Sequence, residues 1–202
     1  MRPITLIAGA LLAFLAVPAW AQQGEPTNIR GTVAKAESAT LLVKSREGGT
    51  ERIALAPGFA VLGVVNLKLA DIKPGDFVGI AAAPGRDGKL HAQEVLVFPE
   101  AARGSGEGHY PWDLRGKNDT MTNATVSGIV SRSSGRMVKL AYKGGEQEIA
   151  ISDRTPVVTF KPAPMALLKP GAAVFLRAQM QPDGMFSAKA VIVEQHGVKP
   201  PM

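Results

Sequence analysis

The chain has 202 residues, of which 46% are hydrophobic and 20% are charged, a composition typical of folded globular proteins. It contains no cysteine, which excludes disulfide bonds, thiolate metal sites and a cysteine nucleophile. The formal net charge of +6 is spread along the chain without a polybasic run, and no aromatic stacking motif accompanies it, so nucleic acid is not expected as a partner.

The first 21 residues have the pattern of a secretory signal peptide. Arg2 provides a positive start, residues 4–17 are almost uninterruptedly apolar, and Ala19-Trp20-Ala21 fits a small-x-small cleavage site. The apolar run is shorter than the roughly 20 residues that a membrane-spanning helix needs, although an uncleaved anchor is the alternative. We therefore predict export to the periplasm, a mature chain that begins at Gln22, and no membrane span after cleavage of the leader.

Apolar and polar residues alternate after the leader with a period of two, which predicts strands with one buried face. Gly48-Gly49 and Asp87-Gly88 are typical hairpin turns, and Pro74 followed by Gly75 ends a short helical stretch. The predicted order is three strands, a short helix and two strands. The strands cover residues 28–34, 41–43, 52–55, 77–82 and 90–98, and the helical turns cover residues 66–72.

The same order is repeated in the second half of the chain. Gly31 and Val33 precede the matching Gly128 and Val130 by the same number of residues. The turn glycines and the Lys-Pro-Gly motif precede their counterparts in the second half by one residue fewer. We therefore expect an all-β protein with two tandem five-stranded OB-like barrels, which bind ligands on a barrel face in other proteins. The predicted boundaries are a leader at 1–21, domains at 22–98 and 124–202, and a linker at 99–123. One continuous barrel or sandwich is the alternative, because a copy of about 70 residues has a marginal core.

The linker carries the candidate site. Its aromatic and apolar residues predict that it is ordered, with Trp112 buried between the two copies, because exposed apolar surface is unfavourable. The predicted ligand-binding residues are Arg103, Glu107, His109, Trp112 and Asp113. Imidazole and carboxylates are suitable ligands for a divalent metal, so His109, Glu107 and Asp113 form an alternative metal site. In the competing interpretation the carboxylates accept hydrogen bonds from backbone N–H groups of turns.

Several motifs of the chain resemble a domain of unknown function that recurs, often in tandem, in exported bacterial proteins. The linker resembles that of one proteobacterial subfamily, whose members are often labelled as metal ABC transporter permeases. A permease needs several apolar spans, which this chain lacks, so the resemblance implies export and tandem domains but not permease activity. The motifs that carry it are Lys73-Pro74-Gly75-Asp76, the Asp-Gly hairpins, and segments of residues 98–114 and 120–126.

The residues contain no recognisable catalytic motif: there is no Gly-x-Ser-x-Gly, His-Glu-x-x-His or phosphate-binding loop. We therefore expect a non-enzymatic periplasmic binding or scaffolding protein, whose partner is an envelope protein or a small ligand, without a cofactor. A metal-binding protein associated with metal transport is one alternative, with a divalent metal in the linker. A hydrolase that uses Ser105 with the nearby His109 is the second.

Overall fold

The structure is a computed structural model that describes residues 26–113 and 116–200. The predicted leader, its cleavage site and Leu114 lie outside the described residues. The all-β prediction is confirmed, as is a short helical turn between the third strand and the last two strands of each copy. No helix in the described part is long and apolar enough to cross a membrane. The strands are β1 (Thr27–Ala36), β2 (Thr40–Ser45), β3 (Thr50–Leu67), β4 (Phe77–Pro84), β5 (Leu90–Val97), β6 (Gly108–Pro111), β7 (Thr120–Arg132), β8 (Gly135–Tyr142), β9 (Gly145–Ser152), β10 (Val157–Pro162), β11 (Ala173–Met180) and β12 (Phe186–Val193), and the 3-10 helices are η1 (Leu69–Asp71), η2 (Glu100–Ala102) and η3 (Met165–Leu167).

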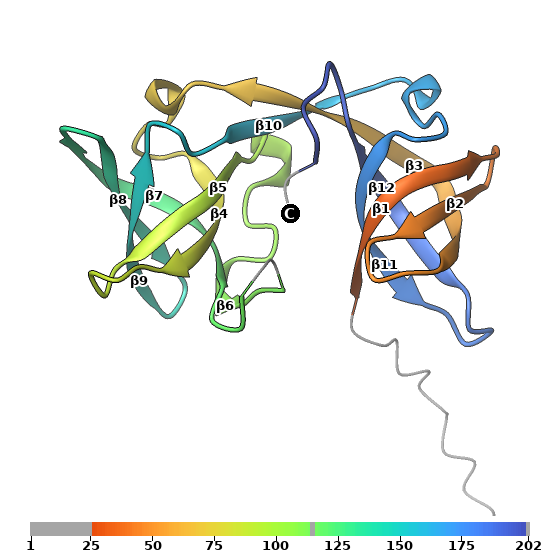
Figure 1. Ribbon diagram of the computed structural model, residues 1–202, viewed down its shortest axis with the longest axis horizontal. Helices are drawn as coiled ribbons and strands as arrows, with labels where there is room; N and C mark the ends of the chain where they lie inside the picture. The colour runs from red at the N-terminus through yellow and green to blue at the C-terminus, as the bar shows by residue number, and fades with distance from the viewer. Residues whose placement is uncertain (1–25, 114–115, 201–202) are drawn as a thin grey trace, which may run out of the picture.

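The strands form two closed five-stranded barrels that lie side by side (Figure 1). Barrel 1 has the order β1-β2-β3-β12-β11 and closes where β11 pairs with β1. Barrel 2 has the order β7-β8-β9-β5-β4 and closes where β4 pairs with β7. Both barrels therefore have the same strand order, as two OB-like copies should.

The barrels do not coincide with the two sequence copies, and this differs from the expectation of one barrel per copy. Each barrel takes its first three strands from one copy and its last two from the other, so that β11 and β12 complete barrel 1 while β4 and β5 complete barrel 2. Exchange of an equivalent element between similar units is a known low-cost rearrangement, because the element makes the same contacts in either place. Here the exchange occurs within one chain.

Two antiparallel strands carry the chain between the barrels. The C-terminal part of β3 extends beyond barrel 1 and pairs with β10, with Leu67 opposite Val157 and Leu62 opposite Pro162. Residues 60–63 still pair with β12 on their other edge. Figure 1 shows both strands running across the top of the molecule from one barrel to the other. This pairing makes the twelve strands one hydrogen-bonded system, so the two alternatives considered from the sequence are both partly realised: the barrels are separate but the sheet is continuous.

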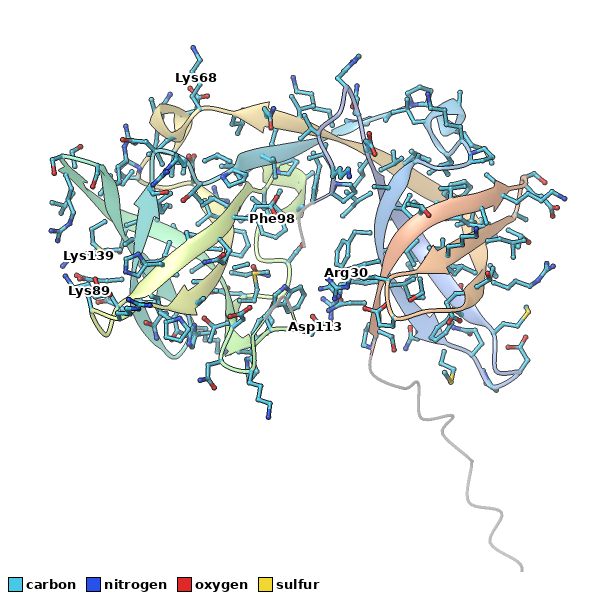
Figure 2. All side chains as sticks on the ribbon, in the orientation of Figure 1. Arg30, Lys68, Lys89, Phe98, Asp113 and Lys139 are labelled. Atoms are coloured by element: carbon cyan, nitrogen blue, oxygen red, sulfur yellow. The ribbon has the colours of Figure 1, made fainter. Side chains whose placement is uncertain are left out.

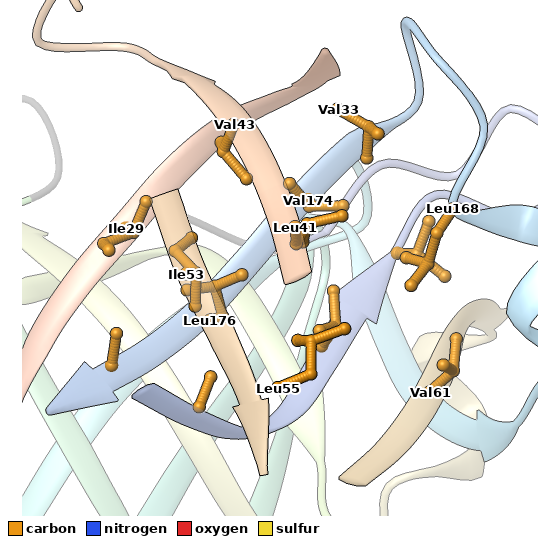
Figure 3. Close-up of a cluster of buried hydrophobic side chains, with 14 of the residues drawn as sticks. Ile29, Val33, Leu41, Val43, Ile53, Leu55, Val61, Leu168, Val174 and Leu176 are labelled. Atoms are coloured by element: carbon orange, nitrogen blue, oxygen red, sulfur yellow. The ribbon is translucent and has the colours of Figure 1, made fainter. Parts of the chain in front are cut away.

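Each barrel has its own apolar core, and each core contains residues of both copies. Figure 3 shows the core of barrel 1, where Leu41 and Ile53 of the first copy lie in one cluster with Val174 and Leu176 of the second. The core of barrel 2 likewise combines Ile80 with residues of the second copy. Since burial of apolar side chains is the main favourable contribution to folding, neither copy has a complete core of its own.

The backbone hydrogen bonds also correct the alignment of the two copies. Val33 exchanges backbone hydrogen bonds with residues 171–172, and Val126 makes the same two bonds with residues 75–76. Val126 is thus the equivalent of Val33, and the expected match with Val130, four residues later, is wrong. A bulge between Val126 and Gly128 moves the following residues to the other face, so that Val130 is exposed whereas Val126 is buried in the core. Alternation within each strand could not reveal the bulge and therefore the error.

Strand β4 is buried on both faces, and its outer face contributes to the space between the two barrels. Val78 and Ile80 point into the core of barrel 2, while the alternate residues Gly79 and Ala81 lie on the outer face of the barrel. All four are buried, because the outer face of barrel 2 is covered by other parts of the chain. A strand covered on both faces shows a continuous apolar run, as residues 77–82 do.

Candidate functional site

The described part of the linker is ordered and contains its own strand. After η2, residues 108–111 form β6, which pairs antiparallel with the start of β7, so that His109 lies opposite Thr122 and Tyr110 opposite Met121. Successive side chains of a strand point to opposite faces. His109 and Tyr110 therefore have different surroundings, and the polar cluster predicted for the linker is divided between them.

Asp113 is attached to barrel 1. Its carboxylate accepts hydrogen bonds from Nη1 and Nη2 of Arg30 at 2.8 and 2.9 Å, and its backbone oxygen accepts one from Arg46 at 3.3 Å. The side chain of Arg30 is 6% exposed, whereas that of Asp113 is 58% exposed. Figure 2 shows the two side chains pointing toward one another in the space between the barrels. The contact ties the linker, which leads into barrel 2, to β1 of barrel 1.

Two aromatic rings flank the guanidinium of Arg30. Its Cζ lies 5.4 Å from the ring centroid of Trp112 and 5.2 Å from that of Phe175, distances at which a cation is attracted to an aromatic face. Partial burial raises the pKa of Asp113, but the hydrogen bonds and positive charge of Arg30 outweigh it, and the net effect lowers the pKa. The pair is therefore a charged one that orders the aromatic side chains around it.

His109 faces barrel 2. Its Nδ1 shares a hydrogen bond of 2.8 Å with the hydroxyl of Thr122, and its ring lies 6.4 Å from that of Tyr142. Burial lowers the pKa of His109, because the charged imidazolium loses water without gaining a carboxylate. This side chain thus contacts β7 and β8 of barrel 2 and does not join Asp113.

The other two predicted site residues also have separate contacts. Glu107 accepts a hydrogen bond of 2.9 Å from the backbone N–H of Lys143, in agreement with the competing interpretation of a carboxylate that satisfies a turn. Arg103 is exposed, pairs with Glu100 at 2.6 Å and donates to the backbone oxygen of Gly75. Within residues 26–113 and 116–200, no three Asp, Glu or His residues lie close enough to hold a metal ion, so the geometry gives the alternative metal site no support.

Between the barrels the structure contains a cavity of about 640 Å³, a size that suits a small organic molecule. It is formed by the outer faces of both barrels together with β10 and the linker, and five of its side chains are aromatic. Trp112 is the only residue of the predicted ligand-binding set that lines it. The lining residues are Pro26, Gly79, Leu96, Phe98, Ser105, Tyr110, Trp112, Met121, Asn123, Phe160, Phe175, Leu176, Arg177, Gln179, Gln181, Ser187, Lys189, Ala190 and Ile192.

Asn123 provides the most deeply buried polar side chain of this cavity, with 8% of the residue exposed. Its Nδ2 donates to the backbone oxygen of Ser105 at 3.1 Å and to the hydroxyl of Tyr110 at 3.2 Å, but its buried Oδ1 accepts no hydrogen bond. Oδ1 lies over Gly79, where an added Cβ would come within 2.7 Å of it. A buried acceptor without a donor costs free energy, so it is a natural contact for a bound molecule.

Trp112 provides an unpaired donor to the same cavity. Its ring packs edge-on against Tyr110, with 6.1 Å between centroids, and its Nε1–H is buried without an acceptor. The residue is only partly buried, less than the sequence predicted, because the cavity lies against the indole. The residues that line the cavity thus include one donor and one acceptor without partners, both buried, among aromatic side chains. A few polar groups among apolar walls are the usual arrangement of a small-molecule site.

Most of these residues were missed by sequence reasoning. Phe175, Arg177 and Gln179 lie on the outer face of β11, which a free-standing barrel would expose to water, and Phe98 follows β5. Aromatic residues at outward positions, together with the uninterrupted apolar run at residues 77–82, are the signals that could have indicated a covered outer face. Comparison of the chain with protein-family models, curated proteins and solved structures finds no match. The function is therefore inferred from the geometry of the cavity.

Proposed function

We propose that this protein is a non-enzymatic binding protein of the cell envelope and that it holds a small molecule in the cavity between its two barrels. The observation that carries the proposal is an aromatic cavity of about 640 Å³ whose lining residues include a buried donor and a buried acceptor without partners, Trp112 Nε1 and Asn123 Oδ1. Export rests on the pattern of the first 21 residues.

The position of the cavity supports binding more than scaffolding. A scaffold needs an exposed surface for its partner, whereas these partly buried aromatic side chains line a cavity between the barrels. Polar atoms in such a site orient a ligand, and the apolar walls provide most of the burial. The Arg30–Asp113 pair holds the linker, and with it Trp112, against barrel 1, so that the site is largely formed before a ligand enters.

A neutral fluorescent probe tests the proposal. N-Phenyl-1-naphthylamine is weakly fluorescent in water and brighter in an apolar site, and it should bind the chain that begins at Gln22 with saturable, one-to-one stoichiometry. Trp112 is the only tryptophan of that chain, because Trp20 belongs to the predicted leader. Energy transfer from Trp112 to the probe therefore reports whether the probe binds beside it.

Two alanine-to-phenylalanine variants locate the binding. Ala190→Phe places a ring in the cavity and should abolish probe binding, while Ala70→Phe adds the same ring at an exposed residue of η1 and should leave binding intact. Circular dichroism of both variants checks that they are folded. Probe binding that is absent in the unmodified chain, or that survives equally in both variants, would refute the proposed site.

A further inference from the structure

The charges at the cavity suggest which class of molecule it accepts. Among its described lining residues there are two basic side chains, Arg177 and Lys189, and no aspartate or glutamate. Neither basic residue forms an ion pair within the described part of the chain. Asp113, the nearby carboxylate of the linker, is paired with Arg30. The cavity therefore has a local positive charge that no described residue neutralises.

The strand register brings these two side chains together. In the β11–β12 pair, Phe175 lies opposite Ile192 and Gln179 lies opposite Ser187. Arg177 and Lys189 are located between these two pairs, on neighbouring strands of barrel 1, and both line the cavity. They form one cationic edge on the barrel 1 side of the space.

Arg177 also reaches across the cavity toward the linker. Its Nη1 is 3.9 Å from the position that a Cβ on Gly106 would occupy, and Tyr110 Oη is 3.3 Å from the same point. Burial raises the pKa of Tyr110, and the positive charge of Arg177 opposes this rise. The guanidinium of Arg177 therefore lies near the hydroxyl of Tyr110 and the amide of Asn123, which donates to Tyr110.

We propose that the ligand is an amphipathic anion: an apolar, preferably aromatic body packed among the rings, with a carboxylate bound by Arg177 and Lys189. This inference rests on the proposed function, because it specifies the ligand of the same cavity. Guanidinium groups bind carboxylates with paired hydrogen bonds, and Arg177 and Lys189, both exposed at the edge of the cavity, are accessible to an entering carboxylate. The Nε1–H of Trp112 and the Oδ1 of Asn123 bind the polar substituents of the body.

Calorimetric titration with two probes of equal shape tests the inference on the chain from Gln22 onward. 2-Naphthoate carries the carboxylate, and naphthalene-2-methanol is its neutral counterpart. Naphthoate should bind about tenfold or more tightly than the alcohol, since a charge-assisted hydrogen bond contributes at least that factor. Added salt should weaken naphthoate binding and leave the alcohol unaffected.

Variants then assign the effect to the two basic residues. Arg177→Gln and Lys189→Gln should each weaken naphthoate binding without changing the affinity for the alcohol, whereas Arg177→Lys should restore part of the loss. Arg52→Gln, at an exposed position of β3 outside the cavity, is the control and should bind as the unmodified chain does.

The possible failures are distinguishable. Equal affinity for both probes, unchanged in Arg177→Gln and Lys189→Gln, overturns the anionic ligand while leaving the cavity as a binding site. No binding of either probe or of N-phenyl-1-naphthylamine overturns the proposed function, and the anionic ligand with it.

Discussion

Arg30 and Asp113, 83 residues apart in the sequence, form a two-pronged ion pair between barrel 1 and the linker, with donor–acceptor distances of 2.8 and 2.9 Å. A buried guanidinium is stable only with partners, because removing a charge from water is costly. Arg30 meets this need with the carboxylate and with two aromatic rings. The pair therefore contributes to the stability of the fold and also holds Trp112, a wall of the cavity, in place.

Asp113→Ala should lower the free energy of unfolding by about 1.5 kcal/mol, a value at the low end for charged hydrogen bonds because Asp113 is partly exposed. Urea unfolding measures this change. Glu100→Ala removes the partner of the exposed Arg103 and should cost less than about 0.5 kcal/mol, as is usual for surface pairs. Equal effects of the two substitutions would mean that the Arg30 pair has no special role.

His109 predicts how stability depends on pH. Its pKa in the folded protein is lowered from the ordinary value of 6.5, so the unfolded chain binds the proton more tightly. The contribution of neutral His109 to the free energy of unfolding is therefore complete at a pH above the ordinary histidine pKa. It is lost as the pH falls through that pKa toward the lowered pKa of the folded protein. Thermal unfolding between pH 8 and pH 5 should show this loss.

His109→Asn should remove that part of the pH dependence, since asparagine can bond to Thr122 but does not titrate. His196→Asn is the matched control at an exposed position, where a positive φ of 51° is well tolerated by asparagine. A pH profile that is identical in the unmodified protein and in His109→Asn would contradict the prediction.

The exchange of strands can be tested by engineered disulfides, because the chain has no cysteine of its own. Thr32 lies opposite Ala173 in the β1–β11 pair, so Thr32→Cys with Ala173→Cys should form a disulfide under mild oxidation. If each copy formed its own barrel, Ala173 would instead face Thr125, the equivalent of Thr32 in the second copy. Thr125→Cys with Ala173→Cys should accordingly stay reduced, and peptide mapping by mass spectrometry distinguishes the two. A disulfide in only the second pair would show that the copies do not exchange strands.

Gly79→Ala should displace side chains that line the cavity. The new Cβ would lie 2.7 Å from Asn123 Oδ1 and 3.0 Å from the ring of Phe98, so a side chain must move, and overpacking of this kind costs about 1–3 kcal/mol. Probe binding should weaken along with stability. Gly128→Ala is the control, because its Cβ would meet only Lys139 at an ordinary 3.8 Å, and its stability should be unchanged or slightly higher. Both changes are read from urea unfolding and from fluorescence titration.

The sequence alone determined the local structure of this protein. Alternation predicts which residues face a barrel core, and the Gly48-Gly49 and Asp87-Gly88 turns mark the hairpins, because strand periodicity and turn preference are properties of neighbouring residues. The apolar content of the linker correctly indicated that its described residues are ordered, and two of the predicted site residues, Trp112 and Asp113, take part in the contacts between the barrels.

Only the tertiary structure decided which copy completes which barrel, and therefore where the cavity lies. The inner faces of the two copies are both apolar, so their strand pattern does not distinguish whether β11 and β4 pair with β1 or with β7. The choice depends on contacts between distant segments, such as the β3–β10 pairing and the Arg30–Asp113 ion pair, which no local pattern encodes. Asn123, Arg177 and Phe175 become neighbours only through that choice, because outward-facing residues of separate barrels meet only when the barrels pack together.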